Sequence, residues 1–168
     1  IRPSIYHLMR GEVYDICDKK IFAFCGASSH DISDGILEKE NWREKARELE
    51  RNEKYMFRVN RLSWWKEELP SQEEMDNGIK NLELCGNKVD YIITHCLPNS
   101  ILDRVDRWCP QHDSLTNYLE KMIVQNVDFK KWFCGHYHID RTIDDKYYIC
   151  YNDFLELLPD STIKTINN

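Results

Sequence analysis

The chain has 168 residues, of which 42% are hydrophobic and 12% aromatic, enough for one globular domain with a buried core. Its formal net charge of −6 argues against a dedicated nucleic-acid binder, because neutralising a phosphate backbone takes clustered lysine and arginine. No apolar run approaches the roughly 20 residues of a membrane helix, and nothing resembles a signal peptide, so we expect no membrane partner. Seven cysteines, an odd number with no C-x-x-C pair, are typical of reduced thiols, and we expect a cytoplasmic protein.

The amino-terminal part begins with strands. Turn residues separate three apolar stretches, and this pattern predicts short antiparallel strands over residues 5–8, 11–16 and 20–25. Small and polar residues at 26–31 indicate a loop after the third strand.

Helices are predicted next. Residues 38–52 carry Trp42, Ala46 and Leu49 at helical spacing, which predicts an amphipathic helix. Residues 63–69 predict a short helical turn that Pro70 stops. Ser71 and Glu74 then stand at capping-box spacing, so a second long helix is expected to begin there and to end near Gly86.

Two buried strands are the strongest signal in the second half. Residues 89–94 and 129–134 are nearly continuous apolar runs, typical of strands that are buried on both faces. A long connection follows the first strand, and Asp113 or Ser114 is expected to cap a helix before the second. The arrangement predicts an α/β fold with parallel strands. The tail, with apolar alternation at 141–143, 147–151 and 154–158, predicts a final β-meander.

Histidines follow both buried strands. His95 comes after the first, and His136 and His138 come after the second. In an extended segment residues two apart point the same way, so His136 and His138 are expected to face one site. Neutral imidazole is the commonest metal ligand, and these three histidines are therefore candidate ligands. The alternative is structural, with each histidine hydrogen-bonded at a strand end.

Two of these stretches resemble the motifs of a known family. Residues 133–138, which end in G-H-Y-H, and residues 92–98, I-I-T-H-C-L-P, resemble the last two metal-binding motifs of calcineurin-like metallophosphoesterases in order and spacing. Residues 64–69 are similar to the tryptophan-leucine helix that precedes the second of these. Residues 22–31 are similar to the strand and glycine loop beside the active site of bacterial members, with Cys25 where many members have glycine.

The resemblance implies a four-layer α/β/β/α sandwich, with residues 1–168 as one domain that is the carboxyl-terminal portion of a metallophosphoesterase. It implies two divalent ions, of manganese, iron or zinc, in the full-length parent, and hydrolysis of a phosphomonoester or phosphodiester by a metal-activated water. By motif position, His95 and His136 would bind one ion and His138 the other. Substrate-binding residues would be Ser28, Ser29 and His30, with a plain loop as the alternative.

The chain also departs from this family. It contains none of the earlier motifs D-x-H, G-D-x-x-D and G-N-H-[DE], which supply a bridging aspartate and the catalytic histidine. Two adjacent dications without a bridging carboxylate repel each other. We therefore expect the chain alone to be an inactive fragment with no catalytic residue, holding at most one metal ion and by expectation none.

The expected partners follow from the same resemblance. The substrate is expected to be a small phosphoester or a phosphoprotein. Because the amino-terminal strands of one sheet would be missing, residues 89–94 and 129–134 are expected to expose pairing edges and to drive self-association. Two other functions stay open: a non-catalytic α/β interaction module, and a mononuclear metal hydrolase with Asp31 or His30 as general base.

Overall fold

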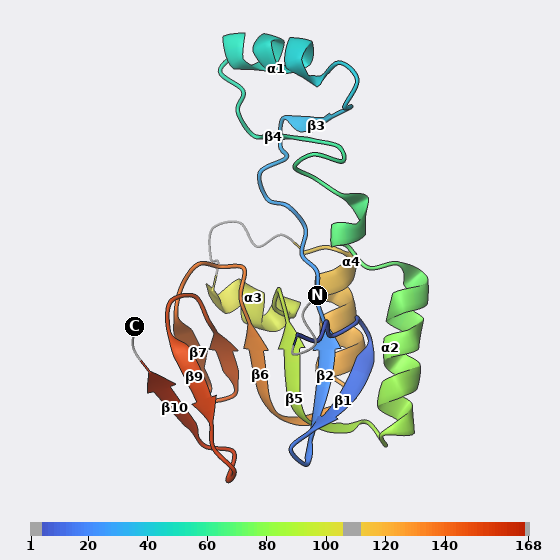
Figure 1. The fold of residues 1–168 in the computed structure, drawn as a ribbon, viewed down its shortest axis with the longest axis vertical. Helices are drawn as coiled ribbons and strands as arrows, with labels where there is room; N and C mark the ends of the chain where they lie inside the picture. The colour runs from blue at the N-terminus through green and yellow to red at the C-terminus, as the bar shows by residue number, and fades with distance from the viewer. Residues whose placement is uncertain (1–4, 106–111, 167–168) are drawn as a thin grey trace.

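The computed structural model describes residues 5–105 and 112–166. Within these residues the fold is mixed α/β, as predicted, and is built around a six-stranded sheet with the order β1-β2-β5-β6-β8-β7 (Figure 1). The strands are β1 (Glu12–Ile16), β2 (Lys19–Phe24), β5 (Lys88–Thr94), β6 (Asp128–Cys134), β7 (Arg141–Ile143) and β8 (Tyr147–Ile149). The four inner strands run parallel, and the two edge strands, β1 and β7, run antiparallel to their neighbours.

The two buried strands confirm one prediction and overturn another. They form β5 and β6, parallel as expected. The prediction that they expose pairing edges is wrong, because β5 lies between β2 and β6, and β6 lies between β5 and β8. Parallel strands of this kind need both neighbours and both faces covered, which is why their sequences are almost continuously apolar.

The helices that pack on this sheet are α2 (Gln72–Leu84), α3 (Asn99–Val105) and α4 (Ser114–Tyr118), the last continued by the π-helical η2 (Leu119–Val124). Capping boxes begin α2 at Ser71 and α4 at Asp113, so both predicted starts are confirmed. Helix α3 was not predicted. It begins where the carbonyl of Pro98 accepts the amides of Ile101 and Leu102, while residues 106–111 of the expected connection lie outside the described residues.

One hydrophobic cluster joins these helices to the sheet. Its fully buried members come from strands, helices and the segment after β5: Phe22, Phe24, Leu82, Ile92, Leu97, Leu115, Leu119, Ile123 and Trp132. Phe24 stacks near Tyr118, whose hydroxyl donates to the carbonyl of Met75, so α2 and α4 are tied side by side over β2. None of the helices in residues 5–105 and 112–166 has both the length and the apolar character that crossing a membrane requires.

The other side of the sheet carries an aromatic row. Tyr91, Phe133 and Tyr148 of three neighbouring strands stand 5.9 and 5.4 Å apart between successive ring centroids. The Tyr91 hydroxyl donates to Ser161, in the turn between β9 (Phe154–Leu157) and β10 (Ile163–Ile166). The strand predicted at 154–158 is confirmed as β9, but it pairs with β10 in a separate sheet, so the predicted meander connection from β8 to this strand is wrong. The predicted strand at 5–8 is also wrong, since those residues have no regular structure.

A small lobe projects from the carboxyl end of the sheet (Figure 1). It consists of β3 (Gly35–Leu37), α1 (Trp42–Arg51) and β4 (Phe57–Val59), with β3 and β4 parallel. The predicted helix stripe is confirmed, because Ala46 is buried with Leu37 and Val59 in a second hydrophobic cluster. The lobe's two strands are only three residues long and were not predicted. The chain then returns to the sheet through the expected short helical turn, η1 (Lys66–Glu68).

Candidate functional site

A cleft of about 440 Å³ lies where the carboxyl ends of β2, β5 and β6 meet the small lobe. Its lining residues are Arg10, Gly26, Ala27, Ser28, Ser29, His30, Asp31, Arg58, Ser63, Glu68, His95 and His136. Loops at the carboxyl ends of parallel strands gather at one edge of the sheet, which is where α/β proteins place their ligands. The structure therefore brings together five of the six predicted site residues.

His95 and His136 form the centre of this cleft. The Nδ1 atom of His136 lies 3.3 Å from Nε2 of His95, and the ring centroids are 4.9 Å apart. Two nitrogens bound to one tetrahedral ion at about 2.0–2.1 Å stand roughly 3.3–3.4 Å apart. In the structure this distance is that of a hydrogen bond between the two rings, and it is also close to the separation of two ligands of one divalent ion.

The backbone of the G-H-Y-H stretch differs from the sequence expectation. Strand β6 ends at Cys134, and both His136 (φ 71°) and His138 (φ 51°) adopt left-handed conformations. The extended backbone predicted for this stretch is therefore wrong. His138 instead stacks on Tyr151, with ring centroids 5.0 Å apart. The His30 ring lies beside the His136 ring, at 6.0 Å between centroids.

The described side chains supply only part of a metal site. In residues 5–105 and 112–166, no group of three or more histidine, cysteine, aspartate or glutamate side chains is placed to hold a metal ion. His95 and His136 fit as two ligands of one ion, and His138 in its stacked position does not add a third.

Burial keeps the two central imidazoles neutral. Burial first, and then charge repulsion from His95, His30 and His138, lower the pKa of His136 to about 4. Burial, followed by repulsion from His138, also lowers the pKa of His95. At neutral pH both rings therefore keep the lone pair that a metal ion needs.

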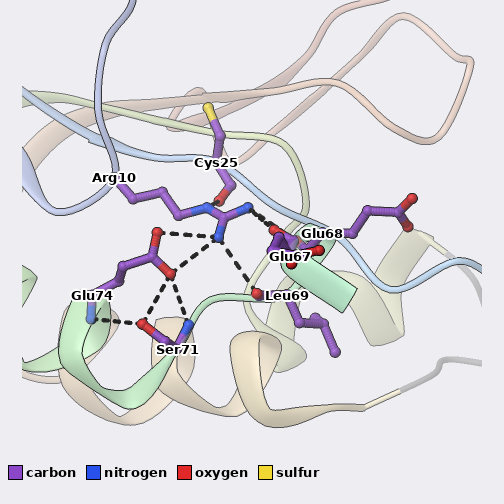
Figure 2. Close-up of polar contacts among 7 residues, drawn as sticks. All are labelled: Arg10, Cys25, Glu67, Glu68, Leu69, Ser71 and Glu74. Atoms are coloured by element: carbon purple, nitrogen blue, oxygen red, sulfur yellow. Dashed lines mark hydrogen bonds and ion pairs between the residues drawn. The ribbon is translucent and has the colours of Figure 1, made fainter. Parts of the chain in front are cut away.

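Arg10 stabilises the wall of the cleft that the sheet forms, through the contacts drawn in Figure 2. Its guanidinium donates to the backbone carbonyls of Cys25, Glu67, Glu68 and Leu69 and pairs with the Glu74 carboxylate at 3.3 Å. These contacts join the loop after β2 to the segment between η1 and α2. In the sequence Arg10 reads only as a turn residue, because the carbonyls that it binds lie 15 to 59 residues away in the chain.

The same wall positions the loop at residues 26–31, which carries the candidate substrate-binding residues. The Ser29 hydroxyl donates to the Glu68 carboxylate at 2.7 Å. Gly26 has φ +141°, and a Cβ atom there would stand 2.6 Å from the Glu68 carbonyl oxygen, so this close approach needs glycine. Ser28 and Ser29 are thereby held on the cleft surface beside the two histidines.

The opposite wall comes from the small lobe. Arg58 of β4 forms an ion pair with Asp31, which follows His30 in the loop. Sequence reasoning missed Arg10, Arg58, Ser63 and Glu68 as cleft residues, since none stands in a recognisable motif.

Comparison with known proteins adds no relative: no family model matches the chain, and no curated protein or solved structure matches it either. Fold and site define the class coarsely, as a mixed α/β protein with a histidine-lined cleft at the carboxyl edge of its sheet.

Proposed function

We propose that the chain is part of a metal-dependent phosphoesterase of the calcineurin-like class, in which His95 and His136 bind one divalent ion in the cleft. The observation that carries this proposal is the 3.3 Å separation of their facing nitrogen atoms, which suits two ligands of one ion. Such an ion would polarise a phosphoester and generate a nucleophile from bound water.

The surroundings of the histidine pair support a phosphate ligand. Ser28, Ser29 and His30 line the same cleft, on the loop held by Arg10. Their hydroxyl and imidazole groups are hydrogen-bond donors to phosphate oxygens. The substrate in this proposal is a small phosphoester or a phosphoprotein, and the compartment is the cytoplasm.

The finer parts of the resemblance belong to the same proposal. In an α/β/β/α sandwich, a second sheet would pack over the aromatic row of Tyr91, Phe133 and Tyr148. His138 would bind a second ion after leaving Tyr151. Because the described residues contain no group of three or more possible metal ligands, we expect the 168-residue chain alone not to hydrolyse a phosphoester.

Mn²⁺ titration followed by histidine-selective NMR tests the metal site. The chain has six histidines, so each imidazole signal can be assigned by substitution. We expect paramagnetic broadening of His95 and His136 first, with His7 as an internal control. His95→Ala should remove the broadening of His136. If Mn²⁺ leaves both signals sharp, the histidine pair of the 168-residue chain binds no Mn²⁺, and the non-catalytic interaction module becomes the favoured function.

A second candidate is the mononuclear metal hydrolase. It is favoured by His30, whose ring lies 6.0 Å from that of His136 and lines the cleft, as a general base would. Hydrolysis of para-nitrophenyl phosphate by the 168-residue chain with Mn²⁺, lost in both His136→Ala and His30→Ala, would establish this function and contradict the inactive fragment.

Self-association remains part of the proposal, although not through the edges of β5 and β6. Exposed apolar side chains instead lie on the β9–β10 hairpin, where Phe154 is 64% exposed and Ile166 46% exposed. Light scattering should find a species larger than the monomer. A monomer at all concentrations would contradict the expectation.

A further inference from the structure

The small lobe places one cation over the cleft. Along β4 the side chains alternate, as in any strand, so Phe57 and Val59 pack in the lobe's own cluster and Arg58 between them faces the other way. There it lines the cleft and pairs with Asp31. Ser63 lies nearby because its hydroxyl accepts the Val59 amide at 2.9 Å.

The two arginines of the cleft differ in how far they are engaged. Arg10 has an 18% exposed side chain and is bound by four carbonyls and a carboxylate. Arg58 has a 43% exposed side chain, and Asp31 is its one carboxylate partner in the described part of the chain. The Asp31 side chain is 22% exposed, so the pair is only partly buried, and an incoming anion can reach the solvent-exposed side of the guanidinium and compete with Asp31.

The position of Arg58 relative to the metal ligands indicates what that anion is. The His30 ring lies beside His136, and the next residue, Asp31, holds Arg58. Arg58 thus lines the same cleft as the histidine pair and contacts the loop that carries His30. A phosphate at His95 and His136 leaves the guanidinium free for another group, and a guanidinium fork binds phosphate oxygens in a bidentate manner.

We propose that Arg58 is a second anion subsite of the cleft, exchanging Asp31 for the substrate, and that the substrate is a phosphoester carrying a second phosphate group, of the diphosphate class. This inference rests on the proposed function, because the first phosphate occupies the histidine pair. The rigid wall then holds the reacting phosphate, and the lobe selects the substrate by its second charge.

The test compares two anions on the metal-free 168-residue protein at low ionic strength. Pyrophosphate and inorganic phosphate are titrated while the imidazole signals of His30, His95 and His136 are followed by NMR. The wild-type protein should bind pyrophosphate about tenfold more tightly than phosphate, and Arg58→Met should remove this preference. Arg61→Met is the matched control: it removes the same charge from the same part of the chain, at an arginine paired with Glu67, and should leave both affinities unchanged.

Asp31→Asn separates a binding role from a structural one. If Arg58 exchanges partners, this variant removes the competitor and should tighten pyrophosphate binding several-fold, opposite in sign to Arg58→Met. If the ion pair only holds the lobe, both variants should weaken binding alike, and that result overturns the inference. Equal wild-type affinities for the two anions overturn it as well.

The outcome is independent of the metal test. Selective Mn²⁺ broadening of His95 and His136 without a pyrophosphate preference leaves the proposed function standing and removes the anion subsite. The reverse result removes the metal site and leaves a diphosphate-binding cleft.

Discussion

The two walls of the cleft are built differently. The wall formed by the sheet rests on the large cluster around Leu119 and Trp132 and is tied by the multiple contacts of Arg10. The lobe wall rests on three buried side chains, Leu37, Ala46 and Val59, and reaches the cleft through the partly buried ion pair of Arg58 and Asp31. Sites that need fixed geometry are best held by densely packed elements, whereas regions with few buried contacts open locally at low cost. Under the proposed function, the first wall would carry the chemistry and the second would select the substrate.

The largest contrast is expected from one leucine in each core. Leu119 is fully buried in the large cluster, so Leu119→Ala should cost about 2–5 kcal/mol of global stability. Leu37→Ala, at 8% exposure in the lobe, should lie at the lower end of that range, because a small cluster collapses more easily around a cavity. Urea unfolding measures both.

Hydrogen exchange sharpens this prediction. Leu37→Ala should speed amide exchange in α1 and β4 and leave β5 and β6 protected. If exchange rises equally in the sheet and the lobe, the two walls unfold as one cooperative unit, and the lobe does not open locally.

Arg10→Met should be the most damaging single change on the cleft surface. It leaves partly buried carbonyls without a donor and the Glu74 carboxylate without its cation, and should destabilise the protein by about 3 kcal/mol. Arg58→Met, on the lobe wall, should cost less than about 1 kcal/mol. Thermal unfolding of the two variants beside the wild type measures the difference. Equal losses would show that Arg58 is as structural as Arg10.

Alanine variants of two glycines with positive φ angles can distinguish the effect of a steric clash from that of backbone strain. Gly26 (φ +141°) faces the Glu68 carbonyl oxygen, whereas the lobe's Gly35 (φ +112°) has open space around it. Each alanine variant bears a strain of about 1–3 kcal/mol, and Gly26→Ala must in addition displace the Glu68 carbonyl from Arg10. Gly26→Ala should therefore be the less stable variant and the one that weakens phosphate binding. A weaker effect on phosphate binding than that of Gly35→Ala would contradict the described wall.

The smallest expected effect is a pH dependence. Partial burial raises the pKa of Glu74, but hydrogen bonds from Ser71 and the charge of Arg10 outweigh burial and hold that pKa below its ordinary value of 4.5. The unfolded state thus binds a proton at Glu74 more readily than the folded state does. The stabilisation is complete above pH 4.5 and is lost as the pH falls through the folded-state pKa.

Glu74→Gln should reduce the loss of unfolding free energy between pH 6 and pH 3 by less than about 1 kcal/mol, as measured by urea unfolding. Glu67→Gln serves as the control, because Glu67 pairs with Arg61 where both side chains are more than half exposed. If Glu74→Gln loses as much unfolding free energy on acidification as the wild type, the Arg10 contacts do not stabilise the charged carboxylate.

Elements with strong local signals could be predicted. The capping residue Ser71 begins α2, Asp113 begins α4, and continuous apolar runs form β5 and β6. Elements whose stability comes from distant partners could not. Strands β3 and β4 have three residues each and exist because Gly35–Leu37 pairs with Phe57–Val59 across helix α1.

The candidate site shows the same division. The residue types at its centre, His95 and His136 after two buried strands, are evident from the sequence because strand ends follow from local hydrophobic patterning. Their 3.3 Å approach, the turning of His138 onto Tyr151 and the Arg10 and Arg58 contacts appear only in the tertiary structure. Hydrophobic periodicity acts over a few residues, whereas a hydrogen bond or an ion pair joins whatever side chains the packed fold brings within reach.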